Sequence, residues 1–263
     1  MFVGLLVTTI CVSTTPVQAQ PEARLDYSTT PDVPVGELDD WSTTLKSRVY
    51  SRYLGSNGAI FHRDPVFQAD ITMAHDDGLY FNLWGSMGLE SMEWNDDYGD
   101  EVDVTVGWAH EVSGISLDFG ISYLELVDLR HSEDDVWWFY AEASKPYELT
   151  EEVTLSPFAH LDYYADAEFS YLKPYIEAGA YTSVQLCEDV SFDMRTSLLY
   201  DTGIFGFDSG FIGKANAGIN WKWSETVTLE CLNIKFAHSF IEEPSEDPRG
   251  DEIAFGVGVQ VKF

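Results

Sequence analysis

The sequence predicts an all-β fold: a 12-stranded antiparallel transmembrane β-barrel with short periplasmic turns and longer extracellular loops. Three observations predict this fold. The chain ends on a strictly alternating segment, similar alternation recurs from Trp41 onward, and the connections between the alternating segments are short and long in turn. Alternation with a period of two is typical of strands that have one apolar face and one polar face.

The C-terminal segment has the clearest alternation and ends on Phe263. Its apolar positions are Ile253, Phe255, Val257, Val259, Val261 and Phe263, with Ala, Gly, Gln or Lys between them. An edge strand this apolar promotes aggregation unless it is covered or paired, and closure of a barrel pairs it. Because outer-membrane barrels typically present a terminal aromatic residue to the barrel-insertion machinery, we expect that machinery and outer-membrane lipid as partners.

The first 40 residues are predicted to lie outside the barrel. Residues 1–19 resemble a signal peptide, because an apolar stretch at 2–12 precedes a small-residue cleavage site that ends at Ala19. This segment lacks the Lys or Arg that usually precedes such a stretch. Residues 20–40 are polar and contain three prolines, so they are expected to form a linker, and residues 41–263 form the barrel domain.

Twelve segments from Trp41 onward are expected to be strands. They are residues 41–53, 65–75, 79–87, 101–112, 115–125, 136–147, 152–163, 171–184, 190–201, 211–223, 226–238 and 252–263. The short connections are 76–78, 112–114, 148–151, 185–189 and 224–225, and the longer ones are 54–64, 88–100, 126–135, 164–170, 202–210 and 239–251. This alternation is typical of outer-membrane barrels, and an even strand number places both barrel ends on the periplasmic side. In segment 226–238 the apolar face changes between Cys231 and Leu232, so we expect a β-bulge near Cys231.

Composition excludes several classes of protein. The formal net charge of −31 argues against a nucleic-acid partner, since phosphate binding needs clustered Lys and Arg. Beyond the N-terminus, no apolar run reaches the roughly 20 residues of a membrane-spanning helix. Cys187 and Cys231 lack metal-ligand spacing, so we expect packing roles, or a disulfide if they meet, and no metal or cofactor. The acidic loop segments 95–100 and 242–247 are expected to be solvated, with calcium binding as the alternative.

Short motifs in the first half of the barrel resemble a known family. They are Tyr50-Ser51-Arg52-Tyr53-Leu54-Gly55, Gly78-Leu79-Tyr80, Trp84-Gly85-Ser86 and Glu101-Val102-Asp103, followed by Gly107, Gly114-Ile115, Asp118, Gly120 and Tyr123. In these motifs the chain resembles the TorF-type porins (Gcw_chp family) over about residues 41–125 and, more loosely, over the whole barrel. It departs at Val106-Gly107-Trp108, where the family has an aromatic-rich Tyr-Gly-Tyr stretch. The resemblance implies an outer-membrane location and a barrel shape more than a particular solute.

If the apolar sets face lipid, the opposite sets line the lumen. The predicted pore-lining residues are Asp70, Asp103, Asp118, Glu142, His160, Lys173, Glu177, Asp193, Arg195, Lys214, Lys222 and Lys262. The cations of three consecutive segments would form a basic wall, and Asp70, Asp103 and Asp118 an acidic wall, with a transverse field across a water-filled pore. The alternative is that these charges pair with one another and fill a closed lumen.

These features predict a porin-like channel, without enzymatic activity, for passive diffusion of small hydrophilic solutes or ions through the outer membrane of a Gram-negative-type bacterium. One alternative is a lipid-modifying barrel enzyme, which would need a Ser-His pair with an orienting group. The sequence has no GxSxG motif, and its six His are scattered singly. A second alternative is a soluble exported β-sandwich that binds carbohydrate through Trp94, Trp137 and Trp138, although in a barrel Trp137 and Trp138 would be girdle or wall residues.

Overall fold

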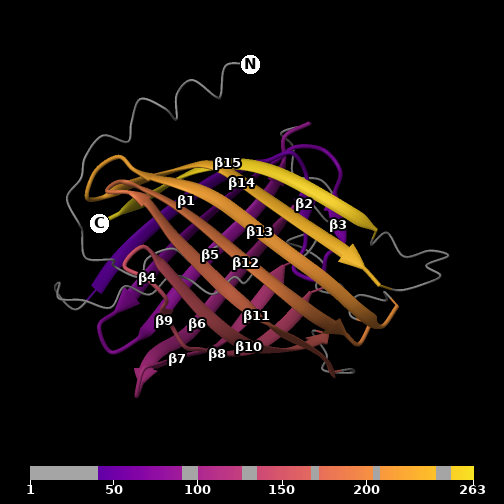
Figure 1. The fold of residues 1–263 in the computed structure, drawn as a ribbon. Coiled ribbons are helices and arrows are strands. Elements are labelled where there is room, and N and C mark those ends of the chain that lie inside the picture. The colour runs from indigo at the N-terminus through magenta and orange to yellow at the C-terminus, as the bar shows by residue number, and fades with distance from the viewer. Residues whose placement is uncertain (1–40, 91–99, 126–134, 167–171, 204–207, 241–249) are drawn as a thin grey trace.

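The computed structural model describes residues 41–90, 100–125, 135–166, 172–203, 208–240 and 250–263, and within them the chain forms a closed antiparallel barrel (Figure 1). The wall strands are β1 (Trp41–Tyr50), β4 (Val66–His75), β5 (Leu79–Gly88), β6 (Glu101–Val112), β7 (Ile115–Glu125), β8 (Val136–Ser144), β10 (Val153–Asp166), β11 (Leu172–Cys187), β12 (Val190–Asp201), β13 (Gly210–Lys222), β14 (Val227–Ser239) and β15 (Asp251–Lys262). Each wall strand pairs with the next, and β15 pairs with β1 to close the barrel.

The prediction of a 12-stranded antiparallel barrel is confirmed, with strand ends within three residues of the predicted ones. Three short strands lie outside this set. The two-residue strand β9 (Tyr147–Glu148) pairs with the start of β10 in the connection that follows β8. The strands β2 (Tyr53–Leu54) and β3 (Ile60–His62) form a separate hairpin between β1 and β4. The predicted strand 41–53 therefore ends at Tyr50, where the chain leaves the wall.

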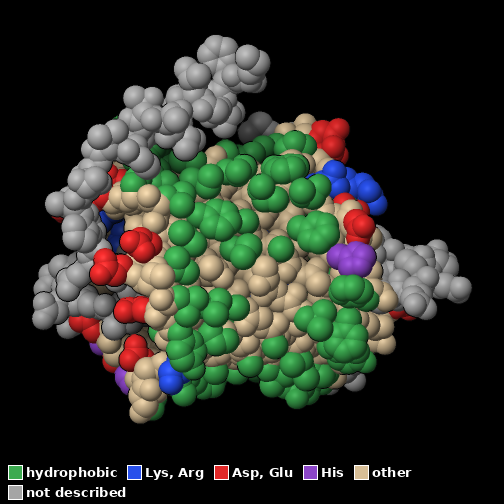
Figure 2. Space-filling view, in the orientation of Figure 1, with side chains coloured by type: hydrophobic (Ala, Val, Ile, Leu, Met, Phe, Trp, Pro, Cys, Tyr) green, Lys and Arg blue, Asp and Glu red, His purple; other side chains and the backbone are tan. Residues whose placement is uncertain are grey.

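The outer face of the wall is apolar. Along β6, for example, Val104 is 52% exposed and Val106 is 38% exposed, whereas their neighbours Asp103 and Thr105 are buried. Figure 2 shows apolar side chains spread over the visible face, with acidic side chains toward its two ends. An apolar band of this kind suits contact with lipid, in which outward-facing charges are costly. None of the described residues lies in a helix that is long and apolar enough to cross a bilayer.

The predicted β-bulge in strand β14 is confirmed. The register of β14 against β15 shifts between Glu230 and Asn233, so one extra residue is inserted there. Cys231 and Leu232 are both exposed as a result, while Glu230 and Asn233 are both buried. The thiols of Cys187 and Cys231 are free, so the disulfide considered from the sequence does not form.

The inner face combines polar side chains with large aromatic rings. The rings of Trp138 and Tyr164 stack at 5.6 Å, and those of Tyr164 and Tyr175 stack at 5.7 Å. Trp138 is thus an inner wall residue, whereas Trp137 faces outward beside Tyr123. Trp94, the other proposed stacking platform, lies outside the described residues, as do most of the two acidic loop segments.

Candidate functional site

The barrel interior is the candidate site, because most of the predicted pore-lining residues are buried there. Nine of them are at most 8% exposed: Asp70, Asp103, Asp118, Glu142, His160, Glu177, Asp193, Arg195 and Lys214. Lys173 and Lys262 are half-buried, and Lys222 is exposed at the periplasmic end of β13. The alternation of the strands therefore predicted which side chains point inward. Their role in lining a pore remains a prediction.

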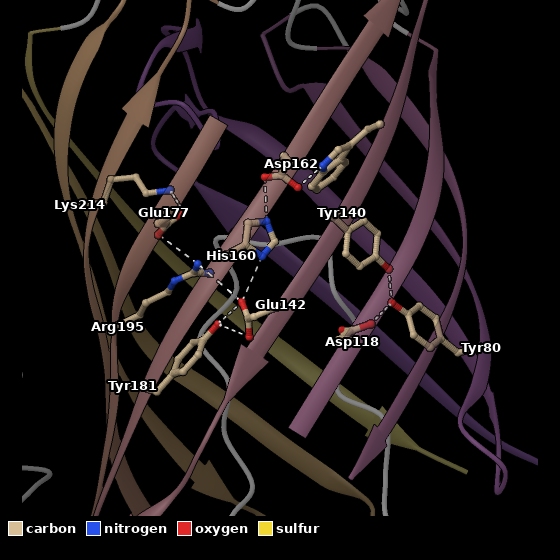
Figure 3. A network of polar contacts seen from close by, with 11 residues as sticks. Tyr80, Asp118, Tyr140, Glu142, His160, Asp162, Glu177, Tyr181, Arg195 and Lys214 are labelled. Carbon is tan, nitrogen blue, oxygen red and sulfur yellow. Dashed lines mark hydrogen bonds and ion pairs between the residues drawn. The ribbon is translucent and has the colours of Figure 1, made fainter. Parts of the chain in front are cut away.

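A buried network of charged side chains, which we call the inner charged network, extends over the consecutive wall strands β8, β10, β11, β12 and β13 (Figure 3). Its members are Glu142, His160, Asp162, Glu177, Arg195 and Lys214. Glu177 lies between two cations, with Arg195 Nη2 at 3.0 Å from Oε1 and Lys214 Nζ at 2.7 Å from Oε2. The Arg195 guanidinium also lies 4.3 Å from the centre of the Phe158 ring. Such pairing offsets the cost of burying these charges.

His160 continues this network toward β8. Its Nε2 is 2.7 Å from Asp162 Oδ2, and its Nδ1 is 3.3 Å from Glu142 Oε2. Tyr181 donates a hydrogen bond to Glu142, and the indole N–H of Trp138 donates one to Asp162. Both ring nitrogens of His160 thus face carboxylates, an arrangement that holds the imidazole in place.

The expected basic wall is not present as a continuous surface. Arg195 and Lys214 are interleaved with Glu177, and Arg195 Nη2 is also 3.9 Å from Glu142. The prediction of a basic wall is therefore wrong for these two cations, and the alternative in which charges pair with one another holds on this side. The physical reason is that isolated buried cations are too costly in a low-dielectric interior.

Two tyrosines connect strand β8, at the edge of the inner charged network, with strands β5 and β7. The hydroxyl groups of Tyr80 on β5 and Tyr140 on β8 are hydrogen-bonded, and Tyr80 also donates to Asp118 Oδ1 at 2.8 Å. The rings reach each other over Gly107 and Gly120, which are cross-strand partners on β6 and β7. A Cβ atom at either glycine would collide with these rings, so the glycines make room for the contact.

Carboxylates outnumber cations in the buried set. Among the described residues, 12 Asp and Glu are buried against three Lys and Arg. Glu101 and Asp103 on β6 are two neighbouring inward-facing carboxyl groups, at 2% and 1% exposure. Tyr53 donates a 2.6 Å hydrogen bond to Glu101, and one oxygen of Asp103 is buried without a hydrogen-bond partner.

The sequence did not predict that the connection 54–64 would fold into the barrel. Leu54, Asn57 and Ala59 in the β2–β3 hairpin are 3%, 1% and 0% exposed. Lys214 Nζ donates a 2.9 Å hydrogen bond to the carbonyl oxygen of Ser56, so the hairpin contacts the inner wall. The dipeptide Asn57-Gly58 between two apolar pairs is a hairpin signal that could have identified the turn, although not its direction.

A closed antiparallel barrel with an apolar outer face and a charged inner face belongs to the class of bacterial outer-membrane β-barrels. The likenesses to known structures are of that class. The chain is similar to the NanC porin, with a TM-score of 0.55 and 12% identity over 83% of this chain and 100% of that one. It is similar to the KdgM porin in complex with disordered oligogalacturonate, with a TM-score of 0.50 and 10% identity over 84% and 99% of the two chains.

A third similar structure is the COG4313 outer membrane channel from Pseudomonas putida F1, with a TM-score of 0.50 and 12% identity over 91% of this chain and 100% of that one. No family model and no curated protein matches the sequence. At these identities the likenesses establish the fold. The predicted outer-membrane β-barrel is confirmed at that level.

Proposed function

We propose that the chain is an outer-membrane, porin-like channel for the passive diffusion of small hydrophilic solutes or ions. The observation that supports this most is the division of the wall into an apolar outer face and a polar, charged inner face. Such a channel needs no covalent chemistry, because the width and charge of its lumen determine which solutes pass. The proposal includes an export signal at 1–19, a linker at 20–40 and recognition of the C-terminal strand by the insertion machinery. Membership of the TorF-type porins remains part of this proposal.

We further propose that this channel prefers cations. Among the described residues the buried carboxylates exceed the buried cations, and a surplus of one charge on a low-dielectric wall raises the local concentration of counter-ions. KdgM has a structure with oligogalacturonate, a polyanion, and the acidic interior described above is unsuited to a solute of that charge. Glu101 and Asp103 are the side chains chosen for the test, because they are buried together on the inner face of β6.

The test is the reversal potential of single channels in planar bilayers under a salt gradient. We expect cation selectivity in the unmodified protein and a clear loss of it in Glu101→Gln/Asp103→Asn. The matched control is Asp76→Asn/Asp77→Asn, which removes two charges from the exposed β4–β5 turn and is expected to change the selectivity much less. Gel mobility before and after boiling verifies that each variant is a closed barrel. A closed barrel without conductance would overturn the channel, and unchanged selectivity in the double variant would overturn the role of this pair.

A further inference from the structure

The β2–β3 hairpin is attached to the barrel wall at two opposite places. In the order of strands around the barrel, β6 and β13 are six positions apart, half of the circumference. At the base of the hairpin, Tyr53 bonds to Glu101 on β6, and its ring lies 5.9 Å from that of Trp84 on β5. At the tip, Ser56 bonds to Lys214 on β13. The hairpin therefore crosses the lumen rather than following the rim.

The tip is closely packed against the wall. A Cβ atom on Gly58 would lie 3.1 Å from Ala237 Cβ on β14 and 3.1 Å from Ile212 Cγ2 on β13. Gly58 has a φ of +80°, a left-handed conformation that glycine adopts easily. The tip also contacts a third wall strand, because the Ser56 hydroxyl is 3.5 Å from the Tyr164 hydroxyl on β10. Three wall strands thus surround the tip.

The hairpin also has its own internal hydrogen bonds. The backbone N–H of Gly58 donates to the carbonyl of Gly55 at 3.0 Å, and that of Gly55 donates to Ala59 at 2.8 Å. The Asn57 side chain accepts a 3.1 Å hydrogen bond from the N–H of Ala59. These bonds satisfy the turn locally, so the hairpin is a folded element with a defined shape.

We propose that the β2–β3 hairpin is the constriction of this channel and that Lys214 is the residue that holds it across the lumen. This inference rests on the proposed channel function. Lys214 is suited to the role because its ammonium group bonds at the same time to the hairpin backbone and to Glu177 of the inner charged network. Hydrogen bonds from a charged donor are stronger than those from a neutral donor, and this one joins the hairpin tip to a buried part of the wall.

The first variant is Lys214→Met, which keeps the aliphatic stem and removes the bonds to both Ser56 and Glu177. We expect the single-channel conductance to rise roughly twofold and larger sugars to enter proteoliposomes in a swelling assay, because the tip is released. The matched control is Lys222→Met, which removes the same charge from the same strand, about 27 Å away at its periplasmic end. We expect the control to leave the size limit for sugars unchanged.

A disulfide distinguishes release of the hairpin from a change of charge. In a background with Cys187→Ser and Cys231→Ser, we combine Gly58→Cys with Ala237→Cys, since a small shift brings the two Cβ atoms to disulfide distance. Added to Lys214→Met, the oxidised pair is expected to restore the conductance and size limit of the unmodified protein. Reduction is expected to return both to the values of Lys214→Met. A further variant replaces residues 54–61 with a short Gly-Ser turn and is expected to have the highest size limit.

The outcomes separate this inference from the channel itself. Suppose that the unmodified barrel conducts, and that Lys214→Met and the hairpin replacement have the same size limit for sugars as the unmodified barrel. The hairpin is then not the constriction, and the inference is wrong. If the unmodified barrel is silent and the hairpin replacement conducts, the hairpin occludes the lumen. The passive channel is then overturned, while the position across the lumen that the inference gives to the hairpin holds. If every variant is a closed barrel by gel mobility and none conducts, both the channel function and the inference are wrong.

Discussion

At the scale of single residues, the Glu177 carboxylate neutralises two buried cations, Arg195 and Lys214. Glu177→Gln would keep its size and leave Arg195 and Lys214 buried without the carboxylate between them. Removing one partner of a buried ion pair costs about 3–5 kcal/mol, so we expect a lower free energy of unfolding in urea titrations of the refolded barrel. The matched control is Glu188→Gln in the exposed β11–β12 turn, which is expected to change this free energy by less than about 0.5 kcal/mol. Equal effects of the two substitutions would contradict the role of Glu177.

The paired glycines below the tyrosine rings give a second prediction at this scale. In Gly120→Ala the new methyl group would collide with the Tyr140 ring, and overpacking of this kind costs about 1–3 kcal/mol of unfolding free energy. The matched control is Gly85→Ala on β5, where a Cβ would have its nearest neighbour at 3.4 Å and little should change. If the collision is the cause, Tyr140→Ala in the same chain should reduce the cost of Gly120→Ala in a double-mutant cycle. A cost that stays the same would show that the ring is not responsible.

Strand β14 is the element in which register and charge are linked. The bulge at Cys231 allows Glu230 to face inward, where it accepts hydrogen bonds of 2.6 and 2.7 Å from Arg48 on β1. Deleting Cys231 would remove the extra residue and make the ladder regular. Glu230 would stay opposite Gly258 and Asn233 opposite Gly256, with Leu232 between them, so residues 227–230 would keep their faces. We therefore expect the deletion to form the closed barrel, as measured by the boiling-dependent gel shift.

Cys231→Ser is the matched control for the deletion, because it removes the thiol and keeps the residue count and hence the bulge. It is expected to form the closed barrel as well as the unmodified chain does. A chain that closes with Cys231→Ser and fails to close after the deletion would show that Cys231 is not a removable extra residue and that the bulge itself is needed at this position.

The wall strands were predictable from the sequence because each has its own period-two pattern. The bulge was predictable for the same reason, since the apolar face changes between Cys231 and Leu232. The direction of the β2–β3 hairpin was not predictable, because it depends on contacts such as that between Ser56 and Lys214, which are 158 residues apart. A local pattern identifies a turn and carries no information about the distant wall that receives it.

The ion-pair partners of the interior charges could not be predicted from the alternation either. Arg195 is the register partner of Tyr181, whereas Glu177, to which it bonds, is the register partner of Leu199. The long arginine side chain reaches diagonally along the neighbouring strand, so the pair does not follow from which residues are opposite each other. Alternation predicted the face of each charged residue, and the three-dimensional arrangement of the strands determined its partner.

At the scale of the whole molecule, the excess of acidic residues is divided between the exposed surface and the interior. The formal net charge is −31, and 12 of the described Asp and Glu are buried. The sequence composition gives the total charge. It does not show how many of the acidic residues are buried, because that depends on the closed wall. The buried part acts within the lumen, where it is screened less by salt than the exposed part. The proposed cation preference therefore belongs to the assembled barrel and not to any single strand.

The pairing of β15 with β1 also has a consequence for how the molecule forms. One contact at this seam is a hydrogen bond from the N–H of Phe255 to the Ser51 hydroxyl, between residues 204 positions apart. Contacts between residues so distant in the chain form slowly, because a long loop must be closed before they stabilise anything. Until β15 is in place, β1 and β14 are both open edges, which are prone to pair with other chains. Assembly of the barrel is therefore completed only when its last strand meets its first, and the chain must be protected from aggregation until that moment.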